Sequence, residues 1–265
     1  MKQIAIFIFF LFIIEQVICQ QTKQKIFNLK ASTGLASYKI NDRLLNYYNY
    51  SGLSFLPINI VGEYIYAKNL FVMDLYNNKS KLTPQDIQTA YYTENYIKQW
   101  DAHLKIEYYR NILVMDKNIE IYAGISNNSN VSSQEEYYSN LLFEYAKGYR
   151  KTYRLSLLDI STNVLINIRY NKSFLRLKSG YSLINYSARP DDNFVKQFGI
   201  QDASIWKFST PENHVGLEFS IFYQLNSWEK TGITAEYNFL YNSFYSPISL
   251  RYLKMLFLIG INKTF

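Results

Sequence analysis

The sequence predicts an all-β protein, a transmembrane antiparallel up-and-down β-barrel of about twelve strands. Three observations lead to this class: a short apolar segment at the start, many runs in which apolar and polar residues alternate, and connections that alternate between short and long. Ten strands are the runner-up number, because the runs between residues 140 and 158 are the least regular.

The first residues have the features of an export signal. Residues 4–14 form an unbroken apolar run. The run is too short to cross a bilayer as a helix, which takes about 20 residues, and it matches the apolar region of a signal peptide. Val17 and Cys19 occupy the small positions before a cleavage site, which predicts residues 1–19 as the signal peptide and 20–265 as the barrel. A lipoprotein acylated at Cys19 is the alternative.

The strands are expected wherever apolar and polar residues alternate with a period of two. In the clearest run, which begins at Trp100, the even positions Leu104 and Ile106 are apolar and the odd positions Lys105 and Glu107 are charged. Twelve such runs are present, at residues 27–37, 56–66, 71–75, 100–108, 119–125, 141–145, 153–157, 164–170, 175–181, 214–225, 231–239 and 257–265. In each of them the apolar side is expected to face outward.

Strand length favours a membrane barrel over a soluble β-sandwich, which also alternates. Several runs reach nine to twelve residues, whereas soluble strands usually have about five or six and a bilayer-crossing strand needs about 9–11. The charges keep to one face, as they must if the other face meets lipid, where a Lys or Arg costs about 2–4 kcal/mol.

The connections differ in length, as they do between the two ends of a membrane barrel. Twelve strands leave about 20 residues for each strand with its connection, enough to span a membrane of about 30 Å and add loops. Long polar connections are expected near residues 39–50, 78–98, 127–137 and 188–212, and breaks between strands also near 159–162 and 242–247.

The end of the chain completes the pattern. Phe257, Ile259, Ile261 and Phe265 share one face of the final run, and Lys263 departs from it. With the export signal and the alternating runs, this chain resembles Gram-negative outer-membrane β-barrel proteins at the level of architecture, without pointing to a subfamily. The resemblance implies a location in the outer membrane, contact with its lipids and lipopolysaccharide, and a C-terminal assembly signal that the barrel-assembly machinery reads.

A row of polar side chains is expected to face the lumen. It follows from the parity of the runs and consists of Asp101, His103, Lys105, Glu107, Glu120, Arg169, Arg176, Lys178, His214, Glu218 and Glu236. The row could act as a proton relay or a ligand site, but the favoured interpretation is a ladder of salt bridges, because charged pairs on neighbouring strands satisfy one another in a narrow barrel.

Catalytic residues are not predicted. Outer-membrane phospholipases and lipid A deacylases resemble one another in a His-x-Ser pair, yet here His103 is followed two positions later by Lys105, and His214 by Gly216. A serine from a neighbouring strand could still meet either histidine. With one cysteine and two histidines in the chain, no metal or cofactor site is expected.

The expected function is therefore that of a non-enzymatic, porin-like outer-membrane barrel that passes or binds a small solute or presents surface loops. The alternatives are an outer-membrane lipid hydrolase or deacylase and a soluble secreted β-sandwich that binds a ligand. The net charge of +7 favours anionic partners such as lipopolysaccharide phosphates. A nucleic-acid partner is not expected, because no basic cluster accompanies a recognition motif.

Overall fold

The computed structural model describes residues 25–42, 49–84, 92–115, 118–140, 149–190, 204–228, 230–245 and 250–265. The expected signal peptide, its cleavage site and the expected strand at 141–145 lie outside the described residues. Within them, no helix is long and apolar enough to cross a membrane.

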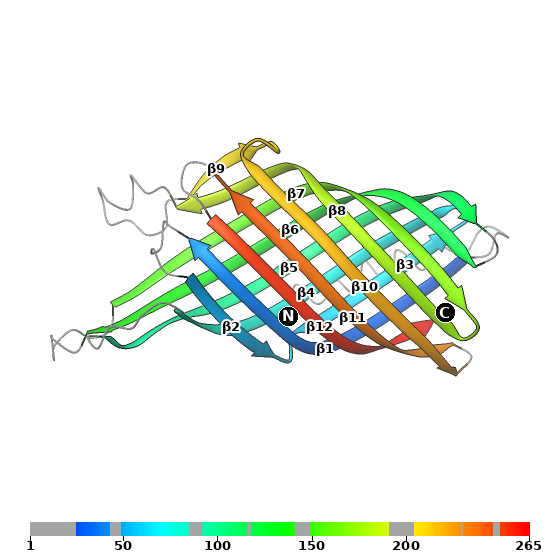
Figure 1. Cartoon of the computed structure of the whole chain (residues 1–265), viewed down its shortest axis with the longest axis horizontal. Helices are drawn as coiled ribbons and strands as arrows, with labels where there is room; N and C mark the ends of the chain where they lie inside the picture. Colours follow the sequence, from blue (N-terminus) through cyan, green and yellow to red (C-terminus); the bar gives the residue numbers. More distant parts are fainter. Residues whose placement is uncertain are drawn as a thin grey trace, which may run out of the picture.

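The described chain consists of β-strands joined into one closed antiparallel sheet (Figure 1). The strands are β1 (Lys25–Asp42), β2 (Asn49–Phe55), β3 (Ile58–Tyr66), β4 (Asn69–Pro84), β5 (Tyr92–Met115), β6 (Ile119–Asn140), β7 (Tyr149–Tyr170), β8 (Ser173–Pro190), β9 (Ser204–Ser209), β10 (His214–Trp228), β11 (Thr231–Phe244) and β12 (Leu250–Thr264). Because β12 pairs with β1 and β10 pairs with β8, the sheet closes into a barrel and is not a sandwich.

The twelve strands occupy ten positions around the described ring. β2 and β3 both lie between β1 and β4, and β9 and β10 both pair with β8, so each of these two couples forms one interrupted wall strand. The first interruption falls at Leu56, whose φ is 62°, and Pro57, which has no N–H to give to a ladder. The second is a turn in which the N–H of His214 bonds to the carbonyl of Thr210.

The described chain has the expected twelve strands, arranged in ten wall positions, although the segments differ in part. β7 runs without a break through the expected connection at 159–162 and joins two expected strands. β6 likewise continues through 127–137, where a long loop was expected. Both faces of that stretch are polar, with Asn127, Asn128, Ser129 and Asn130 in succession, so no alternation marks it as a strand.

The alternation predicts correctly which face of most strands is buried. On β5, Lys105 is 4% exposed and faces the lumen, whereas Leu104 and Ile106 face outward with exposures of 37% and 56%. The expectation is wrong at Leu157, which the lumen buries. The cause is the continuity of β7, since Leu165 is also buried and the same parity carries along the strand to Leu157.

The barrel has a turn end and a loop end. The turn end carries the short connections β3–β4, β5–β6, β7–β8 and β10–β11 together with Phe265, whose N–H bonds to the carbonyl of Phe27 at 2.8 Å. The loop end carries the connections at residues 43–48, 85–91, 141–148, 191–203 and 246–249. In Figure 1 the green ribbons of β6 and β7 extend furthest toward the loop end.

Candidate functional site: the lumen

The interior of the barrel is a layered core. Toward the loop end, the inward face of the wall supplies a cluster of buried aromatic and aliphatic side chains that includes Tyr38, Tyr76, Ile97 and Tyr252. Toward the turn end, a smaller cluster includes Val72 and Tyr109. On β5 the charged positions lie between Ile97 and Tyr109, so the charged layer separates the two clusters.

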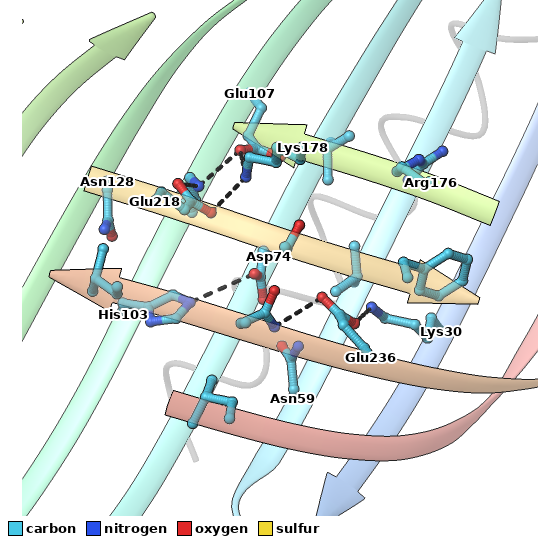
Figure 2. Close-up of a pocket in the computed structure, with 18 of the residues that line it drawn as sticks. Lys30, Asn59, Asp74, His103, Glu107, Asn128, Arg176, Lys178, Glu218 and Glu236 are labelled. Atoms are coloured by element: carbon cyan, nitrogen blue, oxygen red, sulfur yellow. Dashed lines mark hydrogen bonds and ion pairs between the residues drawn. The ribbon is translucent and has the colours of Figure 1, made fainter. Parts of the chain in front are cut away.

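The middle of the lumen holds four charged side chains, Lys105, Glu107, Lys178 and Glu218, which we call the central cluster. Figure 2 shows Glu107, Lys178 and Glu218 of this cluster. Lys178 Nζ lies 2.5 Å from Glu107 Oε1 and 2.7 Å from Glu218 Oε1. Lys105 Nζ lies 2.9 Å from Glu107 Oε1 and also contacts Glu218. The two lysines and two glutamates balance in charge.

Two of these ion pairs, Lys105–Glu218 and Lys178–Glu107, cross the lumen, whereas Lys178–Glu218 joins the neighbouring strands β8 and β10. β5, which carries Lys105 and Glu107, is not a neighbour of β8 or β10 in the ring. Contacts between side chains of these strands therefore connect opposite parts of the wall and close the space between them. Each member is buried or nearly so, and a buried charge is tolerated only when it is paired.

Further ion pairs surround the central cluster. Arg176 of β8 pairs with Glu63 of β3 across the lumen, and Lys30 of β1 pairs with Glu236 of β11, the strand on the other side of β12. His103 Nε2 lies 3.6 Å from Asp74 Oδ2. Figure 2 shows the Lys30–Glu236 and His103–Asp74 pairs close to one another.

The loop-end layer is held by a tyrosine network. Lys254 Nζ bonds to Asp101 Oδ2 at 2.7 Å and lies 3.5 Å from the centroid of the Tyr76 ring. The hydroxyls of Tyr38 and Tyr76 are 2.8 Å apart, and the Tyr252 hydroxyl donates to Asp101 Oδ2 at 3.3 Å. A buried ammonium that is paired and covered by an aromatic ring is well compensated. This layer blocks the lumen on the loop-end side of the central cluster.

The structure therefore brings together most of the predicted lumen row. Three members lie apart. Glu120 and Arg169 form their own pair at the turn end, 3.3 Å apart, with the Arg169 side chain 53% exposed. His214 lies toward the loop end. The partners that the prediction omits are Lys30, Glu63, Asp74 and Lys254. Lys30, Glu63 and Asp74 occupy inward-facing positions of predicted strands, so the alternation could have identified them. Lys254 precedes the predicted strand at 257–265, so the alternation did not mark it.

His214 meets a serine from a neighbouring strand, the arrangement that the sequence left open. Its Nδ1 lies 3.3 Å from Ser182 Oγ and its Nε2 lies 3.2 Å from Asn242 Oδ1. The register between β7 and β8 skips Leu183, a bulge that turns both Ser182 and Asn185 inward.

The proton of Ser182 is committed to another group. Ser182 Oγ donates to Asp159 Oδ1, and Ser161 Oγ donates to Asp159 Oδ2 at 2.6 Å. Because a hydroxyl has a single proton, Ser182 does not direct it to His214 in this arrangement. Both His214 and Ser182 are 2% exposed, so a substrate has no route to them here. The cluster fits the packing of the wall better than nucleophilic catalysis.

Little free space remains in the middle of the lumen. The cavity beside the central cluster has a volume of about 90 Å³, which holds about three water molecules. A wider pocket of about 330 Å³ opens at the turn end and is lined by amide side chains such as Asn167 and Asn226. Among the described residues, no group of three or more His, Cys, Asp or Glu side chains could hold a metal ion.

Comparison with known proteins supports the architecture. No protein-family model and no curated protein matches the sequence. The outer membrane protease OmpT from Escherichia coli matches with a TM-score of 0.53 at 9% identity, over 92% of this chain and 98% of that one. The translocator domain of autotransporter NalP from Neisseria meningitidis gives 0.47 at 6% identity, over 94% and 91%. The transport unit of autotransporter AIDA-I from Escherichia coli gives 0.46 at 11%, over 94% and 92%.

At such low identity the likeness to OmpT shows the fold alone. This chain has the architecture of the Gram-negative outer-membrane β-barrels, as the sequence predicts.

Proposed function

We propose that this chain is an outer-membrane barrel whose lumen is closed, and that it works by presenting its loop end at the cell surface. Of the roles that the sequence predicts, we therefore favour the presentation of surface loops over the passage of a solute. In this orientation the turn end faces the periplasm, as short turns do in membrane barrels, and the loop end faces outward.

The filled lumen is the observation that carries the proposal. The tyrosine network, the central cluster and the turn-end cluster follow one another along the lumen. The cavity of about 90 Å³ between them is far smaller than the volumes of about 300–1,000 Å³ that enclose typical small ligands. A solute would have to displace paired buried charges to pass, and breaking such pairs costs about 3–5 kcal/mol each.

The outward face supports a location in the membrane. Apolar side chains with exposures of 36% or more surround the barrel, among them Leu29, Leu35, Ile60, Phe71, Leu104, Ile106, Ile125, Val164, Leu217, Phe219, Ile221, Ile233, Phe257, Ile259 and Ile261. Soluble proteins rarely expose an apolar patch larger than a few hundred Å². A lipid bilayer would cover this belt on all sides.

The length of the strands supports a role above the membrane. β5 has 24 residues, and β6 and β7 have 22 each, about twice the number needed to cross a bilayer. Because these strands are joined to their neighbours at the turn end by short connections, the excess length extends at the loop end.

Conductance of the purified protein in planar bilayers tests the closed lumen. The expected result is the absence of open-channel steps, measured beside a general porin as the positive control. A variant in which Lys105, Glu107, Lys178 and Glu218 are all replaced by alanine keeps the charge balance and leaves the tyrosine network in place, so it should also show no open-channel steps. Stable open-channel steps from the unaltered protein would show that the lumen conducts.

A further inference from the structure

The wall of the barrel is discontinuous between β2 and β4. The two strands pair at Tyr50–Pro84 and Ser51–Thr83, and the next pair on β4 is Ile58–Asn77 on β3. Between these points, residues 52–57 form no ladder with β4 in the described chain. The Ser54 hydroxyl lies across the interval, 2.6 Å from the Lys79 carbonyl and 2.7 Å from Asn78 Oδ1.

A groove of about 580 Å³ lies at this seam and opens on the outward face. Its sides include Leu53 and Phe55 of β2, which are 63% and 71% exposed, and Trp100 of β5. Behind it the lumen is closed by fully buried side chains such as Leu82 and Ile97. The exposed side chains at its rim make the groove accessible from outside the barrel.

Lysines border the groove on β4 and β5. Lys79, Lys81 and Lys98 all line it and are exposed. Lys81 stands directly opposite Lys98 in the β4–β5 register, and like charges in that position destabilise a sheet. The described residues provide no ion pair for Lys79 or Lys81, although Lys81 Nζ lies 4.1 Å from the Tyr96 ring centroid. An anion bound beside Lys79 and Lys81 would offset this excess of positive charge.

The lysines begin where the apolar belt ends. On the outward side of β4, Phe71, Met73 and Leu75 precede Asn77, and Lys79 and Lys81 follow toward the loop end. Trp100 marks the same boundary on β5, where its Nε1 donates to Asn77 Oδ1 at 2.8 Å. Tryptophan favours the interface of a membrane, so the lysines lie at the height of the headgroups. Leu53 and Phe55 carry apolar surface beside them.

We propose that Leu53, Phe55, Lys79, Lys81, Lys98 and Trp100, the seam patch, form a binding site for lipopolysaccharide. The lysines would contact the phosphates of its lipid A part, and the apolar side chains would contact an acyl chain. The basic and apolar parts of the patch match the phosphates and the acyl chains of such a molecule. In the proposed orientation the loop end faces the outer leaflet, which contains lipopolysaccharide in a Gram-negative outer membrane. The identity of the lipid rests on the proposed location.

Binding of lipid A to the full-length folded chain in neutral detergent tests this site, with native mass spectrometry as the readout. The double variant Lys79→Gln/Lys81→Gln should bind about thirtyfold more weakly, from the usual contribution of a basic residue near an anionic lipid surface. The control variant Lys68→Gln/Lys172→Gln removes two lysines from the turn end and should bind like the unaltered protein. Both pairs alter side chains on the surface, and heat-modifiable migration checks their folding.

A second comparison needs no variant. Dephosphorylated lipid A should bind the unaltered protein much more weakly than lipid A, whereas equal binding would overturn the role of the lysines. Equal binding of the double variant and the unaltered protein would overturn the location of the site. Equal affinity for phosphatidylglycerol would overturn the choice of lipopolysaccharide. Because the barrel is tested in detergent, these outcomes are independent of its conductance and of its cellular location.

Discussion

Glu218 binds one lysine from the neighbouring strand and one from across the lumen, and this double contact makes it the most informative residue of the interior. Lys105 of β5 and Lys178 of β8 both reach its carboxylate. The same two lysines also bind Glu107, so removing one glutamate leaves an unbalanced positive charge inside the barrel.

Replacing Glu218 with Gln should destabilise the barrel by about 3–5 kcal/mol, the usual cost of breaking a buried ion pair by removing one partner. The measurement is the free energy of unfolding in urea, with the protein folded in detergent or in vesicles. Arg169→Gln is the matched control, because its pair with Glu120 is half-exposed, and it should cost about 1 kcal/mol or less. Equal losses in the two variants would contradict the role of the central cluster.

Replacing Ile106 with Arg should impair insertion, because the new charge meets lipid at a cost of about 2–4 kcal/mol. Ile106 is 56% exposed on the outward face of β5. Ile106→Met is the control, since it alters the shape of the side chain without adding a charge. The amount of heat-modifiable protein in outer membranes should fall for the first variant only. Similar amounts for both would show that this face does not contact lipid.

At the scale of the strands, the closing pair depends on the end of the chain. β12 pairs with β1 from Thr264 opposite Asn28 to Leu250 opposite Asp42, which confirms that the final strand closes the barrel. Phe257, Ile259 and Ile261 face outward along it with exposures of 48–61%. Phe265 lies beside Phe27 with ring centroids 6.0 Å apart. Whether assembly machinery reads this pattern stays a prediction.

Deletion of residues 262–265 should reduce insertion far more than deletion of four residues from the 191–203 connection. The first change leaves N–H and C=O groups of β1 without partners, and each such group in hydrocarbon costs several kcal/mol. Protease-resistant protein in outer membranes is the quantity to compare. Equal insertion of the two deletion variants would contradict the role of β12 as the closing strand.

The sequence predicts the barrel and the lumen row because a strand in a membrane has one apolar and one polar face. The rule works where one face of the strand is apolar and the other is polar, as around Lys105. It fails where both faces are polar, as at Asn127 and Asn130 of β6, and where a strand expected to end continues, as at Leu157. The distances that join Lys105 to Glu218 depend on the curvature of the closed sheet, which no local pattern encodes.

At the scale of the whole molecule, the barrel combines a filled lumen with strands that extend at one end only. Charges paired across the lumen fill the interior at the level of the apolar belt, while β5, β6 and β7 extend toward the loop end. Under the proposed function, the barrel supports its loop end, and its role depends on what meets the loop end and the seam patch.

The central claim is that the chain is an outer-membrane barrel with its loop end outside the cell. Labelling of intact cells with a membrane-impermeant maleimide tests it most directly, because Cys19 is the only cysteine of the sequence and the unaltered protein gives the background. Asp192→Cys, in the connection between β8 and β9, should react on intact cells, and Lys172→Cys, in the turn between β7 and β8, should react only after lysis. The reverse pattern, or equal labelling of both on intact cells, would contradict the account.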